Sequence, residues 1–489
     1  MAENNLKQKA ASSMVWTAIQ KYTTMGVGFI SGIILARLLT PHDYGCIGML
    51  AIFMALAEAF IDGGFGSALI QKKNPTQVDY STIFFWNVAV AVVMYVILYF
   101  SAPAISRFYD IPLLCPVLRV QALILFVYAF NLIQKNQLRK KLNFKLLAIV
   151  NITTSVVSLA ITIYMAYNGY GVWSLVIQNL IAAIIPTAVF WFYVKWRPSW
   201  TFSWKSFKEL FSFGFYMFLT HLFNTFSMKL QGLLIGKVYS SNTMGYYSKA
   251  VGTESLASHS IVSVMTQVTY PLYAQVQDDK AVLSNMIKRL TMTTAYITFP
   301  LMFILLLIAK PMFVLLYSDR WLASVPYFQV LCIAGLASCL QSINLQSISA
   351  IGKSKVMFSW SVIKSVLRIV LVVGGLAAFG MKGLLCAVVL QQWTCLFINM
   401  SLVSKHIGYK LVEQIRNLMP IAVVATLAAG ICYAIGSVLQ LNMYLDGIVK
   451  AVVYVALYMA WSWIFKPEAY RYTLTVIPEK FRFWERKSK

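Results

Sequence analysis

The feature that most constrains the fold is a series of unbroken apolar stretches, each about as long as a segment that crosses a lipid bilayer. Clear examples are residues 83–100, 148–166, 172–194, 300–316 and 421–439. A helix of about 20 apolar residues spans the hydrocarbon core, where backbone polar groups must bond within their own segment. The stretches lack the alternation of barrel strands, so they predict an all-α integral membrane protein.

Breaks between the apolar stretches predict fourteen spans joined by short loops. Only 12% of the residues are charged, against about a quarter in soluble domains. The predicted spans are 13–36, 45–70, 80–101, 117–134, 146–167, 171–194, 209–236, 250–274, 290–309, 322–350, 357–379, 383–404, 418–440 and 447–465.

The positive charges predict the orientation. With the N-terminus in the cytoplasm, 28 of the 41 lysines and arginines fall in cytoplasmic segments, 9 fall on the opposite side and 4 lie inside spans. Positive residues accumulate in loops that are not translocated, so both termini are expected in the cytoplasm. The net charge of +25 is then a topology signal, with no nucleic-acid partner expected. The basic tail, residues 466–489, is expected to meet membrane lipids.

The chain also repeats itself. The stretch from Gly32 to Gly45 aligns with that from Gly232 to Gly245, with glycines and a basic residue in register at an offset of 200. The repeat predicts two lobes of six spans each, residues 1–205 and 206–404, in the same orientation. Residues 405–489 add two helices and the basic tail. Parallel repeats of this kind place substrate between the lobes. The connector 195–208, with three tryptophans among basic residues, predicts a helix in the membrane interface.

Ionisable residues inside the predicted spans are the candidate functional groups, since such residues are costly and usually face a cavity. They comprise a cationic set and an acidic set. The cationic candidates for substrate binding are Lys21, His221, Lys229, Lys364 and Arg368, and the acidic candidates for a coupling ion are Glu58, Asp62 and Glu254. Four lysines and arginines against three acids suit an anionic lipid phosphate or pyrophosphate. The acids would bind H⁺ or Na⁺. The alternative is that these groups tie helices together as ion pairs, for example Lys21 with Asp62.

No sequence motif indicates an enzyme. The chain has no phosphate-binding Gly-x-x-x-x-Gly-Lys-Ser/Thr loop, no His-Glu-x-x-His motif and no Gly-x-Ser-x-Gly elbow. Its four histidines are scattered and predict no metal site. We therefore expect no cofactor and a transporter driven by an ion or substrate gradient.

Three segments resemble a known family. LARLLTPHDYG at 35–45, DGGFGSALIQ at 62–71 and DYSTIFFWN at 79–87 are similar to the Wzx-type polysaccharide flippases, in the branch of colanic-acid and lipopolysaccharide exporters. These belong to the multidrug/oligosaccharidyl-lipid/polysaccharide superfamily. The resemblance implies two six-helix bundles in a V, a cationic cavity, and a location in the bacterial inner membrane.

The resemblance also implies a substrate and a partner. The substrate would be an undecaprenyl-pyrophosphate-linked oligosaccharide, an O-antigen or exopolysaccharide unit, moved by alternating access. The glycan polymerase machinery would be a partner. No binding residue carries over from the family, because its members share few binding motifs.

Two alternatives remain open at the level of sequence. A cation-coupled drug antiporter of the MATE type would favour acids in its cavity, whereas cations are in excess here. A membrane-embedded glycan polymerase or ligase would need a sizeable outer loop with catalytic residues, whereas the predicted outer loops are short.

Overall fold

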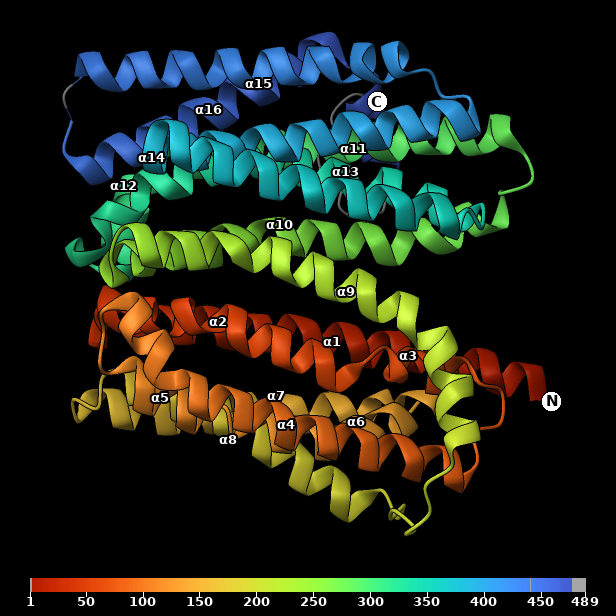
Figure 1. Cartoon of the computed structure of the whole chain (residues 1–489). Coiled ribbons are helices and arrows are strands. Elements are labelled where there is room, and N and C mark those ends of the chain that lie inside the picture. The colour runs from red at the N-terminus through yellow and green to blue at the C-terminus, as the bar shows by residue number, and fades with distance from the viewer. Residues whose placement is uncertain (1, 440, 477–489) are drawn as a thin grey trace. The chain divides into compact units, whose positions relative to one another are not determined.

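The computed structural model describes residues 2–439 and 441–476, and this part of the chain consists of helices without any β-strand (Figure 1). The all-α prediction is therefore confirmed. Residues 477–489, most of the predicted basic tail, lie outside the described residues.

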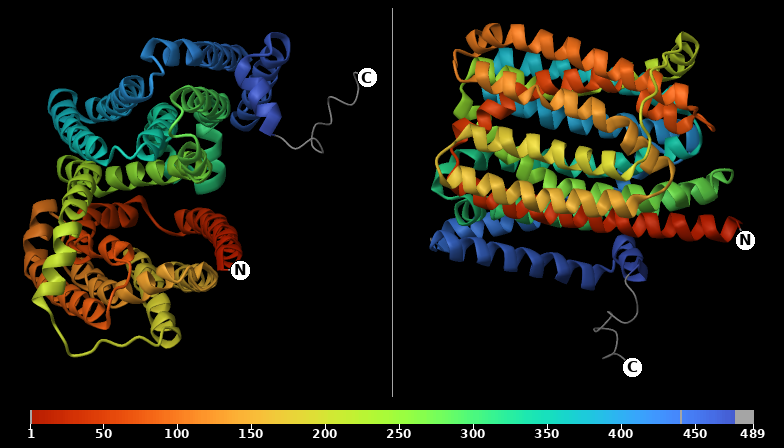
Figure 2. Two further views of the ribbon diagram at one scale, coloured as in Figure 1. Left: turned by 90° about the vertical axis from the view of Figure 1, so that its right-hand side faces the viewer. Right: turned by 90° about the horizontal axis from the view of Figure 1, so that it is seen from below.

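The chain forms two compact units, a first unit of residues 1–248 and a second unit of residues 249–489. The helices of the first unit are α1 (Ala2–Leu38), α2 (Pro41–Asp62), α3 (Phe65–Gln71), α4 (Gln77–Tyr109), α5 (Leu114–Gln121), α6 (Ile124–Lys140), α7 (Phe144–Tyr167), α8 (Val172–Tyr193) and α9 (Trp204–Val238). Helix α10 (Ser241–Gln275) begins in the first unit and continues into the second. The helices that follow are α11 (Lys280–Leu307), α12 (Ala309–Tyr317), the short 3₁₀ helix η1 (Asp319–Ser324), α13 (Val325–Ala350), α14 (Ser354–Ile407), α15 (Leu411–Leu439), α16 (Met443–Phe465) and α17 (Glu468–Val476). Within each unit the long helices lie side by side (Figure 2).

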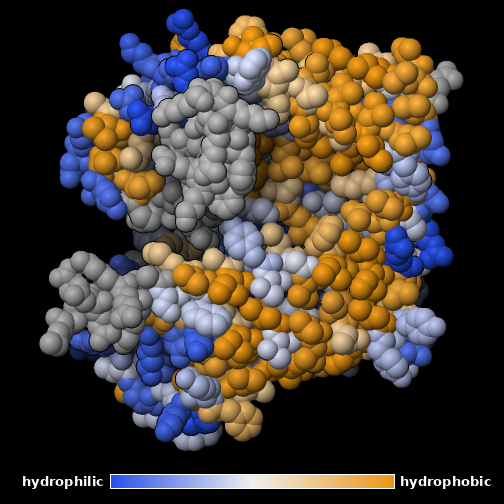
Figure 3. Space-filling view, turned by 180° about the vertical axis from the view of Figure 1, so that it is seen from behind, coloured by the Kyte–Doolittle hydropathy of each residue, from blue (hydrophilic) through white to orange (hydrophobic). Residues whose placement is uncertain are grey.

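Ten helical segments in the described part of the chain are long and apolar enough to cross a membrane. Helices α1, α9 and α10 are also long, with 37, 35 and 35 residues, and they contain three further predicted spans. One of the ten segments, in α14, contains two predicted spans. The surface in Figure 3 is mostly hydrophobic, with hydrophilic residues gathered towards the helix ends. The protein is a multi-pass membrane protein, and the count of fourteen spans remains a prediction.

Helix α14 contains the break that the sequence predicts between residues 379 and 383. Gly380 has a φ of +60° and Phe379 a φ of −133°. A left-handed φ strongly favours glycine, so Gly380 allows the turn. A Cβ added at Gly375 would lie 2.5 Å from the Gly383 carbonyl oxygen, which shows how closely the two arms approach.

Two segments of the family-like sequence are helix starts. The Thr40 side chain accepts from the Asp43 backbone N–H, and the Asp43 carboxylate accepts from the Thr40 N–H at 2.8 Å. Thr76 and Asp79 form the same reciprocal cap on α4. Each cap satisfies backbone donors that a helix leaves free at its start, so these residues fix where α2 and α4 begin.

The first turns of α2 and α10 contact each other at positions related by the 200-residue offset. A Cβ at Gly45 would overlap the backbone carbonyl of Ser241, and a Cβ at Gly245 would overlap the backbone carbonyl of Pro41. Beside them, His42 Nδ1 lies 2.6 Å from Ser241 Oγ. The contact is reciprocal, as expected for related segments, while the lobe boundary at 205/206 remains a prediction.

The prediction of an interfacial helix over 195–208 is wrong for its first nine residues. Residues 195–203 are not helical, and α9 begins at Trp204. Pro198 disfavours a helical conformation at the residue before it. Arg197 instead donates to the carbonyl oxygens of Trp191 and Val194, at 2.7 and 2.8 Å.

Candidate functional site

A pocket of about 450 Å³ in the first unit contains two of the predicted residues, Glu58 and Lys229. Its walls come from α2, α5, α6, α8 and α9. On α2 the lining includes Ile47, Ala51, Ala55 and Glu58. Spacings of three and four residues place side chains on one face of a helix, and the two alanines leave room in front of the carboxylate.

Glu58 faces a cation from another helix. The Lys229 ammonium on α9 is close enough to interact electrostatically with the Glu58 carboxylate. Among the described residues, however, the ion pairs within 4 Å include neither of them. Glu58 is half-buried and Lys229 is exposed. The Lys229 ammonium is therefore placed to meet a ligand in the pocket as well as Glu58.

Asp62 lies one turn beyond Glu58 and has several cationic neighbours. His221 on α9 and Lys135 and Arg139 on α6 all act electrostatically on its carboxylate. A Cβ added at Gly66 would lie 2.9 Å from Asp62 Oδ1 and 3.4 Å from the Asn136 side-chain nitrogen. Glycine at position 66 thus keeps room for the carboxylate.

Lys135 and Arg139 are not among the residues predicted for the site, because the predicted span ends at 134 and leaves them in a cytoplasmic loop. The helix itself runs beyond the end of that span, because α6 continues to Lys140. The residues that follow position 134 include the buried Asn136, Gln137 and Leu138. Their packing against other helices stabilises the last turns of α6. The spacing of four between the two cations places both on the side of α6 near Asp62, a signal that could have indicated them.

The second unit holds the other pair of predicted cations. Lys364 on α14 donates a hydrogen bond to the Asn399 side-chain oxygen, and both Lys364 and Arg368 act electrostatically on Cys395. The Asn399 side-chain nitrogen donates to the Gln341 carbonyl oxygen at 3.4 Å. The partner of Lys364 is therefore a neutral amide, which leaves its positive charge uncompensated by that contact.

Glu254 on α10 occupies a mostly neutral environment in the second unit. Ser258 donates to its carboxylate, while Oε1 is buried without a hydrogen-bond partner in the described part of the chain. A Cβ at Gly335 would lie 2.5 Å from that oxygen. The carboxylate therefore has one unfilled acceptor position facing α13.

Lys21, the remaining predicted cation, is not among the residues that line the pocket with Glu58 and Lys229. It lies on α1, which packs against α7. Among the described residues, the alternative of an ion pair between Lys21 and Asp62 within 4 Å is not observed. No group of three or more metal-ligating side chains occurs in the described part of the chain either.

The amino-acid sequence is similar to those of known proteins. A family model described as polysaccharide biosynthesis protein matches residues 34–326. The chain is 26% identical over 361 residues to the teichuronic acid biosynthesis protein TuaB of Bacillus subtilis, covering 73% of this chain and 74% of that protein. It is 22% identical over 374 residues to the lipopolysaccharide biosynthesis protein WzxC of Escherichia coli, covering 76% of each. A third relative is the succinoglycan biosynthesis transport protein ExoT of Rhizobium meliloti, 24% identical over 80% of this chain and 78% of ExoT.

Solved structures share the fold. The lipid II flippase MurJ in an inward closed conformation matches 94% of this chain and 100% of that chain, with a TM-score of 0.76 and 15% identity. An inward-facing multidrug resistance MATE transporter of the MOP superfamily matches 81% of this chain and 98% of that chain, with a TM-score of 0.63 and 15% identity. The resemblance to this superfamily noted from the sequence is confirmed at the level of fold.

Proposed function

Because the chain belongs to the family of polysaccharide biosynthesis proteins, whose model matches residues 34–326, we propose that it is a flippase for lipid-linked oligosaccharide. The substrate is an oligosaccharide carried on undecaprenyl pyrophosphate, and the protein moves it across the inner membrane by alternating access. The names of WzxC and ExoT refer to lipopolysaccharide biosynthesis and succinoglycan biosynthesis transport, which supports a glycan substrate.

The observation that carries the proposal is the excess of cations around Glu58 and Asp62. Three lysine and arginine side chains, Lys135, Arg139 and Lys229, act on these two carboxylates, and His221 adds a fourth basic group. A charge buried in a membrane is costly unless it is compensated. A mobile pyrophosphate compensates the surplus, because Arg binds phosphate oxygens bidentately and Lys acts as a point charge.

Lys364 and Arg368 extend this cationic surface in the proposed mechanism. They belong to the second unit, and in the working cycle they converge with Lys21 and Lys229 on the pyrophosphate. The hydrogen bond from Lys364 to a neutral amide supports this role, because the contact leaves the ammonium charge available to an anion. Recognition through pyrophosphate allows the sugar part to be read loosely.

The acidic residues couple transport to an ion gradient. Glu58 and Asp62 lie on one face of α2, in the same region as the cations, and Glu254 has an unfilled acceptor oxygen. In this mechanism one of these carboxylates binds H⁺ or Na⁺ during the cycle. The termini are cytoplasmic, as the charge distribution predicts, and the glycan polymerase machinery receives the product.

The test is export of the glycan by Lys364→Ala and Arg368→Ala variants. Both are expected to abolish export while the protein stays folded and abundant in the membrane. Lys405→Ala, which removes an exposed lysine at the end of the same helix, serves as the matched control and should export normally. If the variants fall in abundance and the remaining protein transports normally, the two cations are structural and the proposal fails.

A drug antiporter of the MATE type is the second candidate, because it shares the fold. The two functions separate in proteoliposomes, where the proposed flippase moves a lipid-linked glycan and an antiporter moves organic cations. Uptake of organic cations that requires Glu58 and is insensitive to loss of Lys229 would favour the antiporter.

A further inference from the structure

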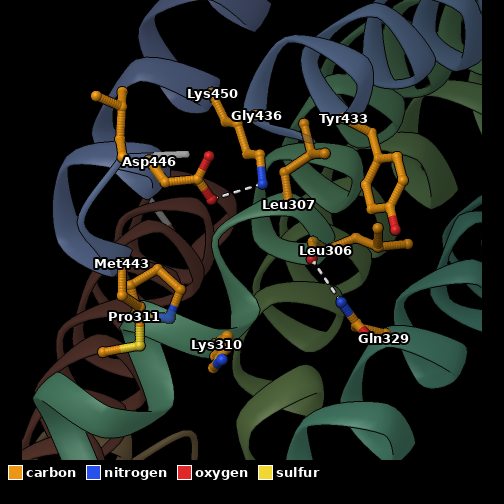
Figure 4. A pocket seen from close by; sticks show the side chains of 11 residues that line it. Leu306, Leu307, Lys310, Pro311, Gln329, Tyr433, Gly436, Met443, Asp446 and Lys450 are labelled. Atoms are coloured by element: carbon orange, nitrogen blue, oxygen red, sulfur yellow. Dashed lines mark hydrogen bonds and ion pairs between the residues drawn. The ribbon is translucent and has the colours of Figure 1, made fainter. Parts of the chain in front are cut away.

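A second pocket, of about 390 Å³, lies at one end of the second unit. It is lined by the end of α11, α12 and α13 together with α15 and α16, the two helices that lie outside the sequence repeat (Figure 4). All of its lining residues belong to the second unit, so it is separate from the Glu58 pocket. By the predicted topology, this end faces the outside of the membrane.

The pocket contains two lysines and one carboxylate. Lys450 Nζ lies 2.6 Å from Asp446 Oδ2 as an ion pair within α16, and the Lys450 ammonium lies 5.8 Å from the centre of the Tyr433 ring. Lys310 supplies the second ammonium, from α12 (Figure 4). Two lysines against one aspartate make the lining cationic, on the side where the sequence places only 9 of 41 positive residues.

The aspartate adds a hydrogen-bond acceptor. Its other oxygen, Asp446 Oδ1, is buried and has no hydrogen-bond partner among the residues that the structure describes. An unsatisfied buried acceptor is costly, so a ligand with a donor group would be stabilised there. The pocket therefore offers positive charge for an anion and one acceptor for a donor.

The sequence keeps this site open with a glycine on α15. A Cβ added at Gly436 would lie 2.5 Å from Asp446 Oδ1 and 2.7 Å from Lys450 Nζ. Any larger residue would therefore displace the charged pair. A Cβ at Gly447 would lie 2.6 Å from Pro311 Cγ, which shows that α16 packs closely on α12.

The surroundings of the pocket are apolar and exposed. Leu441 belongs to its lining, and Leu445, Ile448 and Val452 on α16 are more than half exposed. In a membrane protein such surfaces face lipid chains. An occupant must therefore present a polar head to the lysines and an apolar body to these side chains.

We propose that this pocket binds the head group of a glycerophospholipid that carries both a phosphate and a hydrogen-bond donor. The phosphate lies against Lys310 and Lys450, and the donor, a glycerol hydroxyl or an ammonium, bonds Asp446 Oδ1. A volume of about 390 Å³ lies towards the small end of the usual range for ligand pockets and suits a compact head group. The bound lipid links the added helices to α12. The inference does not depend on the transported substrate, because binding is measured without transport.

The test is native mass spectrometry of the full-length purified protein, titrated with phosphatidylglycerol, phosphatidylethanolamine, phosphatidylcholine and farnesyl diphosphate. Phosphatidylglycerol and phosphatidylethanolamine are expected to bind at least about fivefold more tightly than phosphatidylcholine, which has no donor in its head group. Lys310→Gln should weaken phosphatidylglycerol binding about fivefold, and Lys310→Arg should retain it. Lys382→Gln, at a predicted outer lysine outside this lining, is the matched control and should leave binding unchanged.

The preference of the unmodified protein among the three phospholipids tests the proposal even if a variant fails to fold. Asp446→Asn should reduce the preference for donor-bearing lipids over phosphatidylcholine. Equal binding of all three phospholipids, or an equal effect of Lys310→Gln and Lys382→Gln, would overturn the proposal. Absence of phosphatidylglycerol binding would also overturn it, and farnesyl diphosphate binding that is lost with Lys310→Gln would assign the pocket to the lipid carrier instead.

Discussion

The close contact between the first turns of α2 and α10 predicts that a single methyl group at Gly45 will disturb the conformational cycle. A Cβ at this position would lie 2.6 Å from the Ser241 carbonyl carbon and 3.0 Å from its Cα. Ordinary contacts between carbon atoms are about 3.5–4 Å. Gly45→Ala therefore requires the two helix starts to separate by roughly 1 Å.

The expected free-energy cost of the substitution follows from this overlap. Overpacking costs about 1–3 kcal/mol, and the atoms in the way are backbone, which cannot rotate aside. A change of this size shifts a two-state equilibrium by about 5- to 150-fold, away from the state in which the ends touch. The intrinsic effect of the substitution has the opposite sign, because alanine favours a helix by about 1 kcal/mol over glycine.

The assay is disulfide formation between cysteines placed at positions 42 and 241, where His42 Nδ1 and Ser241 Oγ lie 2.6 Å apart. The pair should cross-link readily in the unmodified background and several-fold more slowly with Gly45→Ala. Gly28→Ala is the matched control, because in the described part of the chain a Cβ there would meet no atom of another segment within 4 Å, and it should leave the rate unchanged. An unchanged rate of disulfide formation with Gly45→Ala would show that a methyl group at this position does not separate the first turns of α2 and α10.

Three further predictions concern the site and the topology. Glu58→Gln and Asp62→Asn should each lower gradient-driven transport in proteoliposomes, and full activity of the double variant would contradict the coupling role. Lys135→Gln should reduce glycan export, because Lys135 acts on the Asp62 carboxylate, whereas Lys141→Gln, just past the end of α6, should not; equal effects would argue against a specific role. Reporter fusions after Lys405 and at the C-terminus should both report the cytoplasm, and a periplasmic signal from either would show that the span count is wrong.

The fold class and many of the candidate residues could be predicted from the amino-acid sequence. Apolar stretches of bilayer length must form helices, because lipid offers no partner for a free backbone N–H or C=O. The break at Gly380 in α14 could be predicted from the glycine and the charged Lys382 between two such stretches. Glu58 and Lys229 could be identified because a charge inside an apolar segment is conspicuous.

Which helices supply the neighbours of each charge depends on how the helices pack, and this could not be predicted from the sequence. Lys135 and Arg139 lie in a basic segment, which predicts a loop. They lie near Asp62 because α6 continues past residue 134. Glu254 was identified as a candidate, but its buried, unfilled oxygen facing Gly335 depends on the packing of α13 against α10. The contact between Gly45 and Ser241 follows a repeat visible in the sequence, yet its closeness does not. Local spacing fixes which residues share a face of one helix, whereas the partner across a helix interface depends on packing between segments far apart in the chain.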